Sequence, residues 1–190
     1  MTTFLSWLRQ LNFDTLLDTL IVVLASLLCI TVHESCHGLA AYWLGDDTAK
    51  RMGRISLNPL RHIDIGGLIM MAIFHFGWAK PVPVNARYFR HPARDMMLVA
   101  LAGPLTNFLL AGLFGVILRL VLAFFPFDVW QQHNFYIFAL SSLQAGVVIN
   151  FGLGWLNLVP IPPLDGSKVV AYFLPGETAW RYLSMERYGF

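Results

Sequence analysis

The sequence predicts an all-α integral membrane protein, a polytopic helical bundle, and three observations support this fold class. First, 57% of the 190 residues are hydrophobic and only 13% are charged, whereas about a quarter of an ordinary soluble domain is charged. Second, three stretches are long and apolar enough to cross a bilayer. Third, basic residues gather between the first and second of these stretches and are absent between the second and third. The length suits one membrane-embedded domain, residues 1–190, without a separate soluble module.

The charge balance says which partners to expect. The net charge is only +2 and no Lys/Arg cluster resembles a phosphate-binding patch, so we expect no nucleic-acid partner. The mean hydropathy of +0.61 predicts a chain solvated largely by lipid. The sequence therefore predicts the lipid bilayer as the main environment, and it contains no signal for an oligomeric state.

The three predicted spans lie at about residues 16–44, 96–125 and 135–159. Each exceeds the roughly 20 residues that a helix needs to cross the hydrocarbon core. The first span ends at Gly45, and the third ends where Pro160 begins a proline-rich turn. Proline and glycine are common helix terminators, so these boundaries are expected at or near those residues.

Between the first two spans we expect a partly embedded, β-rich segment at about residues 51–90. Its apolar part, 63–78, has about 15 residues and contains Gly66-Gly67, which is too short for a spanning helix. We therefore expect a re-entrant segment that dips into the bilayer and returns. The run Pro81-Val82-Pro83-Val84 cannot be helical and is expected to form an extended edge.

The distribution of basic residues predicts the topology. The connections 45–62 and 80–95 each carry four Lys or Arg residues, whereas 126–134 carries none. The positive-inside rule places both basic connections in the cytoplasm. They share a side only if 63–78 returns to the side from which it came. The prediction is a multi-pass protein of the cell membrane.

The motif His33-Glu34-x-x-His37 lies within the first span. Histidines four apart on a helix lie about 40° apart round its axis, so both imidazoles can bind one ion. Glu34 lies about 100° round from His33, beside the ion, where a general base is expected. Three ionisable groups within five residues of a membrane span are costly unless they are functional, so a chance match is the weaker explanation.

Asp165 is the best candidate for a third metal ligand. The predicted topology places it on the same cytoplasmic side as His33 and His37, and the prolines before it free the backbone to direct its side chain. Two imidazoles, one carboxylate and an open position form the pattern of a catalytic zinc site. The alternative is that Asp165 only caps the short helix that follows it.

Other polar residues have simpler explanations when each is taken alone. Asn107 and Asn157 lie in apolar spans, where helix–helix hydrogen bonding is the usual role. Three histidines fall in predicted connections and are expected to be solvated: His62, His91 and His133. His75, in the predicted re-entrant segment, has no preferred role.

Together, several motifs resemble the site-2 protease family of intramembrane zinc metalloproteases, in its small prokaryotic branch without PDZ or CBS domains. They are His33-Glu34-x-x-His37, Gly103-Pro104-x-x-Asn107 and the run from Asn157 through Pro160-Ile-Pro-Pro-Leu to Asp165-Gly166. Two further stretches of that branch are also present: Asn58-Pro59 with His62-Ile63-Asp64, and Trp78-Ala-Lys80-Pro81-Val-Pro83-Val-Asn85. The resemblance covers nearly the whole chain.

The resemblance implies specific roles. His33, His37 and Asp165 would bind one Zn²⁺ per chain, and Glu34 would act on the catalytic water. Asn157 and Asn107 match family positions near the active site and are carried over as substrate or oxyanion contacts. The basic region 45–95 would offer an edge that receives substrate as an added strand. Members of this branch usually continue past a stretch such as 185–190, so we expect a last span beyond residue 190.

The predicted function is hydrolysis of a peptide bond in or near a transmembrane segment of another membrane protein. Such a segment must unwind before it can be cut, so Gly, Pro or polar residues near the cut are expected in substrates. Two alternatives stay open. A divalent-metal transporter would also place His, Glu and Asp inside a bundle, and a non-catalytic metal-binding scaffold would keep the metal for stability alone.

Overall fold

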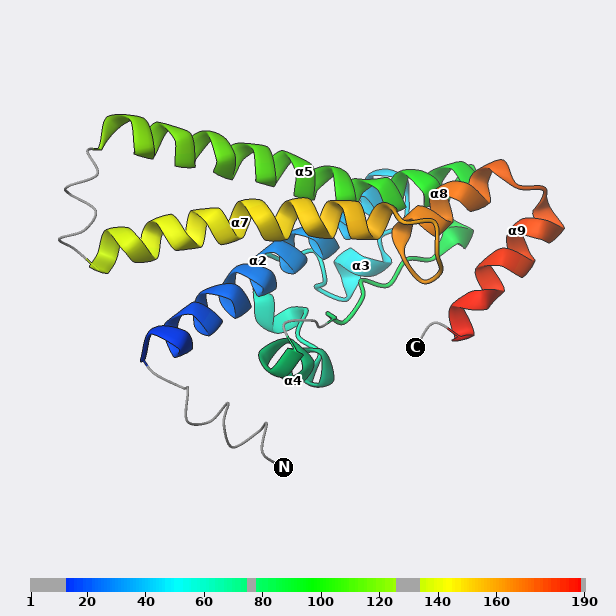
Figure 1. Ribbon diagram of the computed structural model, residues 1–190. Coiled ribbons are helices and arrows are strands. Elements are labelled where there is room, and N and C mark those ends of the chain that lie inside the picture. Colours follow the sequence, from blue (N-terminus) through cyan, green and yellow to red (C-terminus); the bar gives the residue numbers. More distant parts are fainter. Residues whose placement is uncertain (1–12, 75–77, 126–133, 189–190) are drawn as a thin grey trace, which may run out of the picture.

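The computed structural model describes residues 13–74, 78–125 and 134–188, and three long helices dominate it. They are α2 (Phe13–Trp43), α5 (Pro92–Phe124) and α7 (Asn134–Leu158). The three helices pack along one another, with α5 in contact with both α2 and α7 (Figure 1). All three contain stretches long and apolar enough to cross a membrane. The predicted helical bundle is confirmed.

The burial pattern of this bundle is that of a protein surrounded by lipid. Large apolar side chains face outward, among them Leu20, Leu24 and Leu28, which are spaced one turn apart on α2. The largest fully buried side chains are mostly polar, such as Thr31, Asn107 and Asn150. Lipid solvates apolar side chains as well as a protein core does, so the inward positions are left to groups that need hydrogen-bond partners.

The predicted β-rich segment at 51–90 is wrong. It follows α3 (Thr48–Arg51), and its described residues form three short helices and no strand: η1 (Pro59–Arg61), α4 (Ile65–Phe74) and η2 (Ala86–Tyr88). A single antiparallel bridge, Ile63 with Ala79, is the only β pairing among them. Pro81 and Pro83 lack the N–H groups that a strand ladder needs, and Arg54 binds the carbonyls of Lys80 and Pro81 instead.

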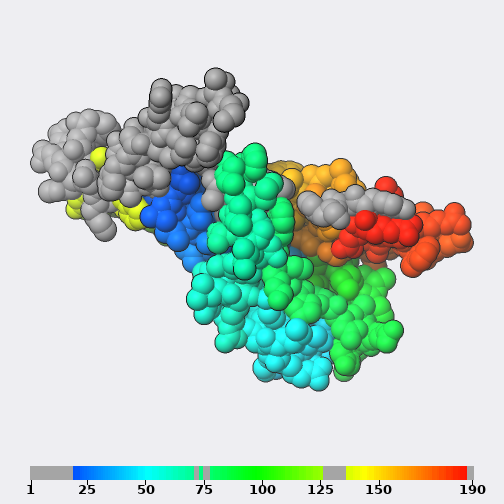
Figure 2. Space-filling model, turned by 90° about the horizontal axis from the view of Figure 1, so that it is seen from below, coloured from blue at the N-terminus to red at the C-terminus, as the bar shows by residue number. Residues whose placement is uncertain are grey.

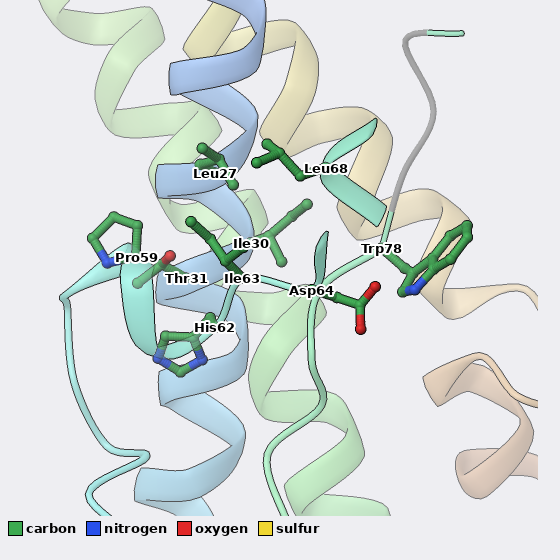
Figure 3. Close-up of a pocket in the computed structure, with 10 residues that line it drawn as sticks. Leu27, Ile30, Thr31, Pro59, His62, Ile63, Asp64, Leu68 and Trp78 are labelled. Carbon is green, nitrogen blue, oxygen red and sulfur yellow. The ribbon is translucent and has the colours of Figure 1, made fainter. Parts of the chain in front are cut away.

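The two ends of the predicted re-entrant segment lie side by side. Besides the Ile63–Ala79 bridge, the Lys80 N–H donates to the His62 carbonyl at 2.9 Å. Gly67 of α4 lies so close to the backbone of Trp78 that any Cβ there would clash. Residues 59–68 and 78–79 pack on α2, where Leu27, Ile30 and Thr31 face them across a small hollow (Figure 3). The two ends of the segment, near His62 and Lys80, therefore lie next to each other.

Two shorter helices complete the described chain, α8 (Asp165–Phe173) and α9 (Gly176–Leu183), followed by the 3-10 turn η3 (Ser184–Tyr188). Helix α8 packs on α5, whereas α9 projects from the bundle (Figure 1). In the space-filling view, the described residues of 45–95 form a lobe that projects from one side of the molecule, next to α8 and α9 (Figure 2). This lobe contains both basic connections.

Candidate metal centre

Helix α2 brings two imidazoles to one point. His33 and His37 are one turn apart, their ring centroids are 4.6 Å apart and their Nε2 atoms are 3.0 Å apart. Both side chains are buried, at 5% and 8% exposure. The helical spacing alone accounts for this approach.

Helix α8 supplies the third group. Asp165 Oδ2 lies 3.2 Å from His33 Nε2 and 3.1 Å from His37 Nε2. The alternative that Asp165 caps α8 is wrong, because Leu164 is the N-cap and Asp165 is already in the first turn, with its carboxylate directed at the histidines. Gly166 permits this approach, since a Cβ there would clash with the Leu158 carbonyl at the end of α7.

Each histidine is held by its other ring nitrogen. His37 Nδ1 lies 2.7 Å from the Val99 carbonyl, and His33 Nδ1 lies 2.9 Å from Asn107 Oδ1. Both partners are acceptors, so each Nδ1 carries the proton and donates it. Each Nε2 is therefore left with a lone pair directed toward Asp165. Contacts of this kind orient metal-binding histidines.

These donors fit one small cation. Two lone pairs and a carboxylate oxygen within 4.8 Å of one another repel unless a positive charge lies among them. Ligand atoms that bind tetrahedral zinc at about 2.0–2.1 Å are roughly 3.3–3.4 Å apart. The observed separations of 3.0–3.2 Å match a compact site of this kind.

Asp165 is a carboxylate at neutral pH. Burial raises its pKa, but the hydrogen bonds that protonated imidazoles of His33 and His37 would donate, together with the charge of Lys168, outweigh burial and hold the pKa below its ordinary range. Lys168 Nζ lies 3.4 Å from Oδ1, the oxygen that faces away from the histidines. Oδ2 is therefore left to the metal.

Gly103 explains how α5 comes so close to the cluster. A Cβ at this position would lie 2.5 Å from His37 Nε2 and 2.6 Å from His33 Cε1. Any other residue at position 103 would therefore clash with the two imidazole rings. Gly103, the first residue of the motif Gly103-Pro104-x-x-Asn107, thus packs directly against the ligands.

Glu34 is half-buried on the adjacent face of α2. Its Oε2 accepts a hydrogen bond from the Val82 N–H at 2.9 Å. The Glu34 side chain therefore lies between the histidine pair on its own helix and the extended chain that precedes η2.

The two asparagines take different places. Asn107 is fully buried behind His33, so its contact is with a ligand and not with a surface that a substrate reaches. Asn157 is half-buried, and its amide donates to the Leu153 carbonyl of its own helix at 3.0 Å. Within the described part of the chain, Asn157 has no hydrogen bond to His33, His37 or Asp165.

The remaining histidines also divide. The prediction that His62 is solvated is wrong, because the residue is only 2% exposed. Its Nε2 lies 2.9 Å from the Ser56 carbonyl oxygen. His91 is exposed as predicted. His75 and His133 lie outside the described residues. The sequence analysis did not identify Val99, because it contacts His37 through its main-chain carbonyl, which every residue type has. It also did not identify Lys168, although the position of this lysine three residues after Asp165 on a helix predicts their contact.

Comparison with known proteins agrees with this geometry. Residues 20–181 match the model of Peptidase family M50. The chain is 35% identical over 169 residues to "Putative zinc metalloprotease YwhC" of Bacillus subtilis, covering 89% of this chain and 76% of that protein. No solved structure matches the chain with significance.

Two mycobacterial relatives are more distant, both named "Putative zinc metalloprotease Rip2". The protein of Mycolicibacterium smegmatis is 28% identical over 183 residues, which cover 90% of this chain and 64% of that protein. The protein of Mycobacterium tuberculosis is 29% identical over 162 residues, which cover 83% and 58%. The chain thus spans about three fifths of these relatives. From the family match and the Bacillus relative together, the chain belongs to peptidase family M50, the site-2 protease family of zinc metalloproteases.

Proposed function

We propose that the chain is an intramembrane protease that hydrolyses a peptide bond in or near a transmembrane segment of a membrane-protein substrate, as in regulated intramembrane proteolysis. One observation carries the proposal. The convergent donors of His33, His37 and Asp165, with Glu34 beside them, lie against a helix that is long and apolar enough to cross a membrane. Such a site cannot be explained by packing and meets its substrate within the bilayer.

The chain's own residues divide the work. His33 and His37 hold Zn²⁺ through Nε2, and Asp165 holds it through Oδ2, with Asn107 and Val99 keeping the imidazoles in the required tautomer. When bound, Zn²⁺ supplies Lewis-acid chemistry, lowering the pKa of water toward about 7 and polarising a carbonyl. Glu34 accepts the proton of the attacking water and returns it to the leaving amine. Asn157 remains our candidate for the oxyanion contact.

The substrate must present an extended peptide bond to Glu34. A helical amide is shielded by its own hydrogen bonds and by the side chains around it. Segments with Gly, Pro or polar residues near the cut unwind at lower cost, because they are weak helix formers. We therefore infer a preference for such segments over uniform poly-leucine spans. The active site faces the cytoplasm in this proposal, because both basic connections lie at its end of the bundle.

The test is cleavage of a single-span substrate with a Gly-Pro pair at its centre, by the zinc-loaded chain in liposomes. We expect the chain to cut it and Glu34→Gln to lose activity by at least about 100-fold while keeping its zinc. A poly-leucine span of equal length is the matched control substrate and should be cut more slowly.

Two results would overturn the proposal. Zinc flux into the liposomes without any cleavage would support the transporter alternative. A zinc-bound wild-type chain that cuts neither substrate, and whose thermal stability depends on the metal, would support the non-catalytic scaffold. The described ligands gather at one place and do not line a path across the bundle, which argues against the transporter alternative.

A further inference from the structure

A short extended strap crosses α2 at Glu34. The strap is the run Lys80-Pro81-Val82-Pro83, and the Val82 N–H donates a 2.9 Å hydrogen bond to Glu34 Oε2. The Val82 side chain is buried against Gly38, where a Cβ would lie only 3.2 Å from Val82 Cγ1. Gly38 is one turn after Glu34, on the same face of the helix. Glycine at that position therefore leaves room for the strap beside Glu34.

The composition of the strap selects the Val82 N–H. Successive residues of an extended chain direct their N–H groups to opposite sides. Pro81 and Pro83 have no N–H, so Val82 carries the one donor in 81–83. In the structure this N–H donates to Glu34 Oε2. The two prolines also restrict the backbone on either side of it, so less conformational entropy is lost when the hydrogen bond forms.

Arg54 holds the strap from the opposite side. Its side chain is almost fully buried, with 8% exposure for the residue. One nitrogen, Nη2, donates to the Lys80 carbonyl and to the Pro81 carbonyl, the latter at 3.1 Å. The other, Nη1, donates to the Arg61 carbonyl at the end of η1. A planar guanidinium can bind several carbonyls in fixed directions at once, which a lysine cannot do.

We propose that Arg54 is a positioning residue for Glu34, acting through the strap. Arg54 fixes the carbonyls of Lys80 and Pro81, which places the Val82 N–H on Oε2 and leaves the other carboxylate oxygen, Oε1, for the attacking water. This inference rests on the proposed role of Glu34 as the base. Its physical basis is orientation: a base held in one rotamer reacts more often than one that samples several.

The sharpest test replaces the Val82 N–H by an ester oxygen, which removes the donor to Glu34 and also weakens the Pro81 carbonyl as an acceptor for Arg54. Val82 is replaced by its α-hydroxy acid, which turns the amide into an ester in the full chain. We expect kcat to fall by about ten- to a hundredfold, because a hydrogen bond to a charged group is lost. KM should stay within about twofold, since substrate binding is untouched, and the zinc content should be unchanged.

Val84 supplies the matched control. It is the same residue type, two positions further on, and the described residues include no hydrogen bond from its N–H. The same ester substitution at Val84 should leave kcat unchanged. A fall in kcat at both positions would mean that any ester in this region disturbs the chain, and it would overturn the specific role of Val82.

The role of Arg54 is tested by substitution, and by combining that substitution with the Val82 ester in a double variant. Arg54→Met should lower kcat as the Val82 ester does, and Arg54→Lys should recover part of the loss. Because both changes act through one hydrogen bond, the double variant should be little slower than the slower single variant. Multiplied losses would mean that Arg54 acts elsewhere. If Arg54→Met does not fold, the same comparison is made with Arg54→Lys, which keeps the charge, and an unchanged kcat in that variant would overturn the role of Arg54.

The outcomes separate this inference from the proposed function. Cleavage that Glu34→Gln abolishes but the Val82 ester leaves at full rate overturns the inference alone. A raised KM with unchanged kcat in the ester also overturns it, because the strap would then bind substrate. Cleavage that survives Glu34→Gln overturns the proposed function as well.

Discussion

At the residue scale, each candidate ligand is fixed by a second contact that leaves its metal-binding atom free. His33 donates to Asn107 and His37 to Val99, while Asp165 turns its second oxygen to Lys168. Such contacts set the tautomer and the direction of a ligand before the metal arrives. Asn107, whose family resemblance suggested a substrate contact, is for this reason best explained as a positioning group.

Asn107→Ala should weaken zinc binding. It removes the acceptor of the His33 Nδ1 proton, and loss of such an outer contact costs about 10- to 100-fold in metal affinity. Competition with a chelator of known affinity measures the change. Asn150→Ala is the matched control, because Asn150 is equally buried but bonds to Cys29 and Gly146. Equal zinc affinities in the two variants would contradict the role given to Asn107.

At the element scale, the connections between helices determine where the site's side chains lie relative to one another. The turn before α8 directs Asp165 back toward α2, and Gly166 lets α8 begin against the end of α7. On the other side of α2, Asp46 secures the chain that continues from the strap: its carboxylate accepts the Asn85 N–H at 2.6 Å and the Thr48 N–H at 3.0 Å. These tethers lie outside the predicted spans.

The Asp46 tether should weaken in acid. Burial raises the pKa of Asp46, but its hydrogen bonds with Asn85 and Thr48 outweigh burial and lower it. A lowered pKa in the folded state gives stability above the unfolded value of about 3.9, which is lost as the pH falls through the folded value. Thermal unfolding should show Asp46→Asn below wild type at pH 7 and closer to it near pH 3. A constant difference would contradict this prediction.

At the scale of the whole molecule, the candidate site and both basic connections lie at one end of the bundle. The end of α2, the beginning of α5 and all of α8 meet there, whereas the end of α5 and the beginning of α7 lie at the other (Figure 1). A polar site at one end of apolar helices is reachable by water without a channel through the bilayer. The arrangement suits a protease that takes water from one side.

Cysteine labelling checks the orientation. In a chain with Cys29 and Cys36 replaced by Ala, Leu57→Cys and Phe124→Cys place single thiols at opposite ends, on residues that are 70% and 77% exposed. A membrane-impermeant maleimide added to intact cells should label position 124 and not 57, because the basic connection faces the cytoplasm. Lysed cells should label both. Labelling of 57 alone in intact cells would reverse the proposed orientation.

The sequence by itself determined the features that depend on local order. The length and apolarity of 16–44, 96–125 and 135–159 predicted the three long helices, and the four-residue spacing placed His33 and His37 on one face. Hydrophobicity and helical periodicity act over short stretches of chain, so both can be read without a fold. The motifs also led to the family that the comparisons show.

Only the tertiary structure decided what depends on contacts between distant segments. It brought Asp165 within 3.2 Å of both histidines, showed α4 where a β-rich segment was expected and placed the strap against Glu34. Some contacts between distant segments run through main-chain groups, such as the Val99 carbonyl that binds His37 and the Val82 N–H that binds Glu34. Every residue except proline has both groups, so no residue type marks them in the sequence and only the fold shows where they bind.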